Sequence, residues 1–183
     1  AITFLSDFTE TSEADDATIA NEILLPLAVF RGLRTPEGRA TLWEILRTGT
    51  DRENLRIALN LLLRDIAEAR PSDADTLGTI LEARADHPIR DRLLFARAQL
   101  LSGLGDQSTA LKLVESLLND FPGSQIRKPA QLASAFLAWR QDPPQFRTAA
   151  ARLLEVIPEL PATERPFYLQ LAGDLYFQNG DYS

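Results

Sequence analysis

Apolar residues recur three and four positions apart along nearly the whole chain, in segments of about fifteen to twenty residues. This spacing is the period of an amphipathic α-helix, and no segment shows a convincing strand pattern. Glycine, proline or a capping residue separates each segment from the next. The pattern therefore predicts an all-α protein of about nine helices, in which antiparallel pairs stack as an array rather than a closed bundle.

Local start and stop signals place the helices. We expect capping at Thr35, with Pro36 in the first turn, and at Asp106. Thr50 and Glu53 have the spacing of a capping box. Asp142 is expected to cap a helix with a proline in its first turn. The predicted helices cover residues 15–33, with a kink at Pro26, then 36–48, 50–70, 72–86, 91–103, 107–121, 126–140, 143–157 and 163–178.

Three regions follow from this pattern. Residues 1–16 are rich in Asp, Glu, Ser and Thr and are expected to form an acidic flexible arm. A metal-binding loop is the alternative for this arm, but it lacks the glycine and ligand spacing of a calcium loop. Residues 17–52 hold the N-terminal helices. Residues 53–183 hold helical repeats, of which the last is expected to be incomplete because the chain stops after its first helix.

Composition narrows the possible functions. The net charge is −7, and arginine supplies all but two of the nineteen basic residues. An acidic chain with scattered arginines disfavours nucleic acid and anionic membrane surfaces as partners. No apolar run is long enough to cross a membrane, and the absence of cysteine excludes disulfides and thiolate chemistry. The lack of methionine indicates a processed chain or a fragment, and the compartment stays undetermined, with the bacterial periplasm slightly favoured.

Two segments resemble the tetratricopeptide repeat, a pair of antiparallel helices. In the first, Ala98, Ala110 and Pro122 are evenly spaced around a turn at Gly105. The second, near the C-terminus, contains Leu169, Ala172-Gly173, Tyr176 and Gly180-Asp181-Tyr182. A degenerate unit lies between them. The resemblance implies a right-handed superhelix, or α-solenoid, whose concave face is lined by the first helix of each pair.

The same resemblance implies that this concave face binds a peptide or another protein. Trp139, with nearby arginine and glutamine side chains, is a candidate anchor there, because tryptophan and arginine dominate many binding interfaces; packing of Trp139 between repeats is the simpler interpretation. Some members of this family hold the C-terminal carboxylate of a partner with lysine and asparagine side chains. The sequence does not support such a carboxylate clamp here. The candidate partner-binding residues on the expected face are Arg92, Phe95, Gln99, Lys128, Gln131, Ala135, Trp139, Gln170, Asp174 and Phe177.

No motif supports catalysis. His87 is the single histidine and is expected in an exposed turn beside Pro88, where the neighbouring Asp86 could orient it for acid–base work. An incidental surface position is the simpler interpretation. Gly103 and Gly105 precede a helix as in phosphate-binding loops, but no strand comes before them and a helix-pair turn explains them. We therefore predict no enzymatic activity, no cofactor and no metal.

The sequence thus predicts a non-catalytic repeat module that binds a protein or peptide, as a scaffold or assembly factor. Arginine, alanine and leucine usage favours a bacterial source, and a role in cell-envelope assembly, secretion or export fits such repeats. Two alternatives remain open. The chain could be a structural or self-associating arm that buries Leu24, Leu25 and Leu27 against a neighbour, or a regulatory domain attached to an enzyme. The oligomeric state is left undetermined.

Overall fold

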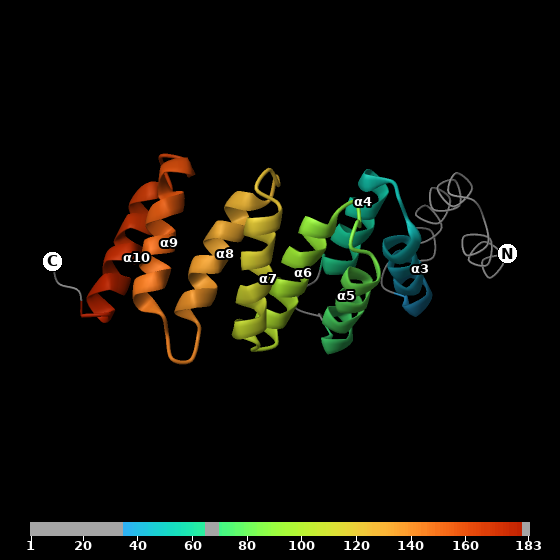
Figure 1. Cartoon of the computed structure of the whole chain (residues 1–183), viewed down its shortest axis with the longest axis horizontal. Coiled ribbons are helices and arrows are strands. Elements are labelled where there is room, and N and C mark those ends of the chain that lie inside the picture. The colour runs from blue at the N-terminus through green and yellow to red at the C-terminus, as the bar shows by residue number, and fades with distance from the viewer. Residues whose placement is uncertain (1–34, 65–69, 181–183) are drawn as a thin grey trace. The chain divides into compact units, whose positions relative to one another are not determined.

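The computed structural model describes residues 35–64 and 70–180 of the chain (Figure 1). Within these residues the protein is entirely helical and contains no strand, which confirms the predicted all-α class. The helices are α3 (Pro36–Thr48), α4 (Arg52–Leu63), α5 (Pro71–Ala83), α6 (Arg90–Gly103), α7 (Gln107–Asp120), α8 (Arg127–Trp139), α9 (Phe146–Val156), the 3-10 turn η2 (Ile157–Glu159) and α10 (Arg165–Gln178).

The chain divides into two compact units, residues 1–93 and residues 94–183. Three predictions lie outside the described residues: the acidic arm 1–16, the helix 15–33 with its kink at Pro26, and the self-association of its leucines. The last two residues of the C-terminal Gly-Asp-Tyr motif also lie outside them.

Capping side chains begin several helices where local signals are strong. The Thr35 hydroxyl accepts a hydrogen bond from the Gly38 backbone N–H (3.1 Å), and the Asp106 carboxylate accepts one from the Thr109 N–H (3.0 Å). Both caps were predicted. The predicted capping box of Thr50 with Glu53 is wrong by one position, because Asp51 is the N-cap and its carboxylate accepts the Asn54 backbone N–H at 2.7 Å. Helix α4 then begins one residue later than expected.

Proline accounts for two further corrections. Pro71 was expected to separate two helices, whereas it is the first residue of α5, where a missing N–H costs nothing. Pro143 was expected in the first turn of a helix, but it lies in the loop before α9, after a cis peptide bond. The following Pro144 disfavours helical geometry at Pro143. Helix α9 therefore starts only at Phe146, with Gln145 in the cap position.

The first unit is built on the packing of α3 against α4. Fully buried leucine and isoleucine side chains from α3, α4 and α5 form its core: Leu42, Ile45, Leu46, Leu55, Leu77 and Ile80. A polar contact joins α3 to α5, because the Arg39 guanidinium pairs with the buried Asp73 carboxylate at 2.9 Å. Asp73 also accepts the Arg70 backbone N–H at 3.3 Å and so closes the start of α5.

In the second unit, helices that follow one another in the sequence pack together: α7 against α8, α8 against α9, and α9 against α10. The core between α8, α9 and α10 is rich in alanine, which lets helix axes approach closely. Its buried members are Ala135, Ala138, Ala149, Ala150, Leu153, Ala172 and Leu175. Alanine also has the highest helix propensity, so the same residues favour the helices and their contact.

Three helices, α6, α8 and α10, begin with an arginine that donates backwards to main-chain carbonyls. Arg90 bonds to the carbonyl of Leu81 at 2.6 Å, and Arg127 bonds to that of Leu118 at 2.9 Å, nine residues back in both cases. Arg165 reaches the carbonyls of Leu160 and Pro158 at 2.9 Å each. Carbonyls near a helix C-terminus lack helical partners, and these guanidinium groups supply the missing donors.

Candidate functional site

The outer side of α10 carries the largest exposed apolar side chains among the described residues. Phe177 is 66% exposed, Phe167 65% and Leu169 50%. Two further predicted binding residues, Gln170 and Asp174, are exposed on the same helix. Gln170, Asp174 and Phe177 follow the i, i+4, i+7 spacing and so lie on one face. Phe167 and Leu169 lie at the two edges of this exposed side. We call these five residues the α10 surface; the opposite side of α10, with Ala172 and Leu175, packs into the core.

The predicted binding residues of α8 have mixed surroundings. Lys128 is exposed, and its ammonium group donates to the Glu159 carbonyl at 3.2 Å. Ala135 is buried, and Trp139 packs against the same cluster, with its ring 6.4 Å from that of Phe136. This end of the α8 stripe therefore contributes to packing between helices. The binding role of Trp139 stays a prediction.

The predicted residues of α6 share the i, i+3, i+7 spacing of one helix face. Arg92 and Phe95 are half-buried, and Gln99 is exposed. The boundary between the two compact units falls within α6, between Leu93 and Leu94. Within α10, Gln170, Asp174 and Phe177 share one face; a binding face shared by the candidates of α6, α8 and α10 stays a prediction.

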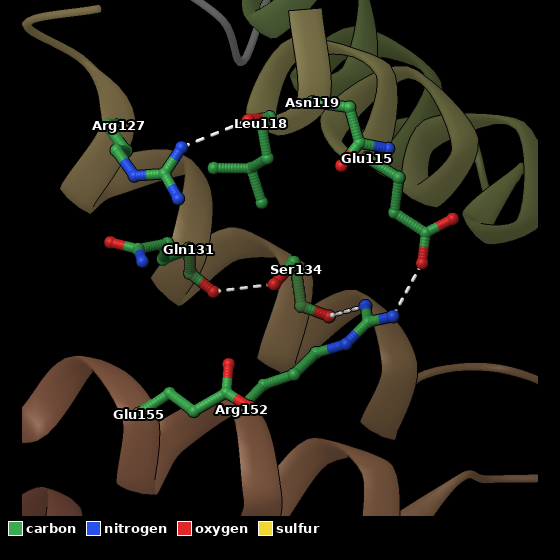
Figure 2. Close-up of a pocket in the computed structure, with 8 residues that line it drawn as sticks. All are labelled: Glu115, Leu118, Asn119, Arg127, Gln131, Ser134, Arg152 and Glu155. Carbon is green, nitrogen blue, oxygen red and sulfur yellow. Dashed lines mark hydrogen bonds and ion pairs between the residues drawn. The ribbon is translucent and has the colours of Figure 1, made fainter. Parts of the chain in front are cut away.

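A polar pocket, which the sequence did not predict, lies between α7, α8 and α9 (Figure 2). Its volume is about 320 Å³. Its lining comes from all three helices and carries two positive charges, two negative charges and only one apolar side chain. The lining residues are Glu115, Leu118, Asn119, Arg127, Gln131, Ser134, Arg152 and Glu155.

Arg152 fixes the geometry of this pocket. Its guanidinium pairs with the Glu115 carboxylate of α7 and donates to the Ser134 carbonyl of α8 at 3.2 Å, which links three helices (Figure 2). The Ser134 hydroxyl in turn donates to the Gln131 carbonyl at 2.7 Å. One arginine thus neutralises one of the two glutamates and connects α9 to both α7 and α8 at this point.

The remaining charged groups of the pocket have fewer partners. Arg127 uses one N–H on the Leu118 carbonyl and forms no ion pair with a described residue. Glu155 is exposed on α9. The side-chain oxygen of Gln131 is buried and receives no hydrogen bond within the described part of the chain. Among the eight residues that line the pocket, sequence analysis singled out only Gln131, because the others become its neighbours only through the packing of the helices.

His87 is buried, which corrects the expected exposed turn. Its side chain is only 4% exposed, and its Nε2 lies 2.9 Å from the Leu46 carbonyl oxygen. The Ile89 backbone N–H donates to Nδ1 at 3.3 Å. A carbonyl only accepts and an N–H only donates, so the ring is neutral with its proton on Nε2. Burial, the main cause, lowers the pKa of His87 below 6.5.

Other candidate chemistry is sparse among residues 35–64 and 70–180. These residues contain no group of three or more His, Cys, Asp or Glu side chains that could hold a metal ion. Gly105, with φ of 93°, forms the turn between α6 and α7 that Asp106 caps. No helix in the described part of the chain is long and apolar enough to cross a membrane.

Comparison with known proteins gives no matching family model, no similar curated protein and no similar solved structure. The resemblance to the tetratricopeptide repeat therefore rests on the motif residues alone.

Proposed function

We propose that the chain is a non-catalytic helical-repeat module that binds another protein through the α10 surface. The observation that carries this proposal is the exposure of Phe167, Leu169 and Phe177 on one helix. Phe167 and Leu169 are two residues apart and so lie at opposite edges of the exposed side of α10, with Phe177 between them around the helix. Exposed apolar side chains of this kind are typical of protein interaction sites. Gln170 and Asp174 stand among them and supply polar contacts that would fix the orientation of a partner.

The chemistry of this surface defines the partner that fits it. Two phenylalanines and a leucine require apolar side chains opposite them, and Asp174 favours a basic residue nearby. We therefore propose a protein segment that presents apolar residues together with lysine or arginine. A role in bacterial cell-envelope assembly or export remains a proposal about context, and the compartment stays a prediction.

Paired substitutions test the surface. Phe167→Ser with Phe177→Ser removes the two most exposed aromatic side chains without opening the core. Leu104→Ser with Leu154→Ser is the matched control, because these leucines are 45% and 42% exposed elsewhere in the same unit. In affinity capture with the intact chain, the first pair should abolish partner recovery while the control pair leaves it unchanged. Equal loss in both pairs, with circular dichroism unchanged, would contradict the assignment to α10.

The chain's two lysines give a second readout. Both Lys112 and Lys128 are exposed, but Lys128 bonds to η2, which packs against α10, whereas Lys112 lies on α7. An amine-reactive cross-linker should therefore join the partner to Lys128 more strongly than to Lys112. Light scattering over a range of concentrations distinguishes the self-associating alternative, since self-association would raise the measured mass of the purified chain.

A further inference from the structure

The pocket between α7, α8 and α9 has the composition of a small-molecule site that is separate from the α10 surface. We propose that it binds a zwitterion of the α-amino acid class, with the ligand carboxylate on Arg127 and the ligand ammonium on Glu155. Three features support this proposal: the size of the pocket, its balance of charges and the unused N–H donors of Arg127.

The size and lining limit the ligand. A volume of about 320 Å³ is at the lower end of the range for ligand pockets and fits a molecule of amino-acid size. Leu118 is the single apolar lining residue. An apolar ligand would therefore bury charged and amide groups without replacing their hydrogen bonds, which is unfavourable. The site fits a small polar ligand.

The charges favour a ligand that carries both signs. Arg152 and Glu115 neutralise each other through their ion pair. This leaves Arg127 and Glu155, neither of which forms an ion pair with another described residue. A simple anion would be attracted by Arg127 and repelled by Glu155. A simple cation would be attracted by Glu155 and repelled by Arg127. A zwitterion with separated charges interacts favourably with both groups.

The open hydrogen-bonding positions match the same ligand. The Leu118 carbonyl takes one of the five N–H groups of Arg127, and the remaining fork suits a carboxylate. Figure 2 shows the side chain of Gln131 between Arg127 above it and Glu155 below it. On the Glu155 side, an ammonium group would donate its N–H groups to the carboxylate, which has no ion-pair partner among the described residues.

Calorimetric titration of the intact chain tests this site. The probes are the twenty standard L-α-amino acids, each up to 10 mM, followed by the N-acetyl and carboxamide derivatives of the tightest binder. We expect at least one amino acid to bind saturably, and each derivative to bind at least tenfold more weakly, because each derivative lacks one charge. No saturable binding by any amino acid would overturn the proposal, and so would an N-acetyl derivative that binds as well as its parent.

Variants then assign the ligand to this pocket. Glu155→Gln removes the ammonium partner and should weaken binding at least tenfold. Arg127→Lys keeps the positive charge but loses the fork, so we expect a smaller loss. Glu159→Gln is the control, because Glu159 is also an exposed glutamate and lies outside the pocket lining, where its carboxylate pairs with Lys128. Unchanged affinity in Glu155→Gln, with circular dichroism identical to the wild type, would refute the site. Neither result bears on partner capture at α10.

Discussion

Replacing His87 by alanine tests whether the buried imidazole is a structural element of the first unit. The neutral ring joins the turn before α6 to the end of α3, since Nε2–H donates to the Leu46 carbonyl, 41 residues away in sequence. Alanine removes this donor and leaves a buried carbonyl unsatisfied, which costs about 1–3 kcal/mol. Loss of the packed ring adds to this figure. We expect the free energy of unfolding to fall by about 2–4 kcal/mol at pH 8.

The pH dependence gives a sharper test than the size of this loss. The pKa of His87 is lowered in the folded protein, mainly by burial, so the unfolded chain binds a proton at a higher pH than the folded one. Acidification below 6.5 therefore favours unfolding, until the pH falls below the folded pKa. A single site contributes a slope of at most about 1.4 kcal/mol per pH unit. The alanine variant lacks this site.

Urea denaturation at a series of pH values measures both effects. Trp139→Phe leaves Trp43, on α3, as the single tryptophan, so its fluorescence reports on the first unit alone. We expect the stability gap between His87 and His87→Ala proteins to be largest above pH 6.5 and to narrow as the pH falls. Titration of carboxylates common to both proteins cancels in the difference. A gap that widens on acidification would refute the neutral buried histidine.

Four further predictions concern two glycines, an ion pair and a cap. Gly49→Ala should destabilise the first unit by about 1–3 kcal/mol in urea titrations, because an added Cβ would lie 2.6 Å from a main-chain oxygen of α3. Gly173→Ala, where nothing lies within 4 Å, should instead stabilise α10 by about 0.5–1 kcal/mol. Asp73→Ala should cost about 2–4 kcal/mol by leaving Arg39 half-buried and unpaired, whereas Asp73→Asn should cost less. Nuclear magnetic resonance titration should give Asp106 a pKa below its ordinary value of 3.8, chiefly because its carboxylate accepts the Thr109 backbone N–H at the start of α7. The stability that this cap contributes should be lost as the pH falls from 3.8 through the lowered pKa of Asp106.

Local chemistry explains which helix boundaries could be predicted from the sequence. Thr35 with Pro36, and Asp106 after Gly105, combine a side-chain acceptor with a backbone that ends one helix and starts the next. These signals act within three or four residues, so tertiary packing has little influence on them. Where two adjacent residues could both cap, as at Thr50 and Asp51, the local signal could not choose between them. The structure uses Asp51.

Functional features were harder to predict because they depend on distant residues. The Arg152–Glu115 ion pair joins positions 37 residues apart, and its formation requires the alignment of α7 with α9. The sequence shows Arg127 and Gln131 at i, i+4 spacing on one helix, but nothing local indicates which charges of other helices face them. His87 is a similar case. Its turn was recognised, while its burial depends on a carbonyl from α3.

The arginines that begin α6, α8 and α10 connect the composition to the fold. Each lies where one helix has ended and the next starts, so carbonyls without helical partners are within reach of its planar fork. A lysine has a single donor centre and would satisfy fewer of them, which explains the use of arginine at these junctions. Arg90 and Arg127 each donate to a carbonyl nine residues back in the sequence, so the same hydrogen bond occurs at the start of α6 and at the start of α8. Because its bond to Leu118 holds Arg127 in place, the positive end of the pocket is preorganised by the same contact that closes the junction.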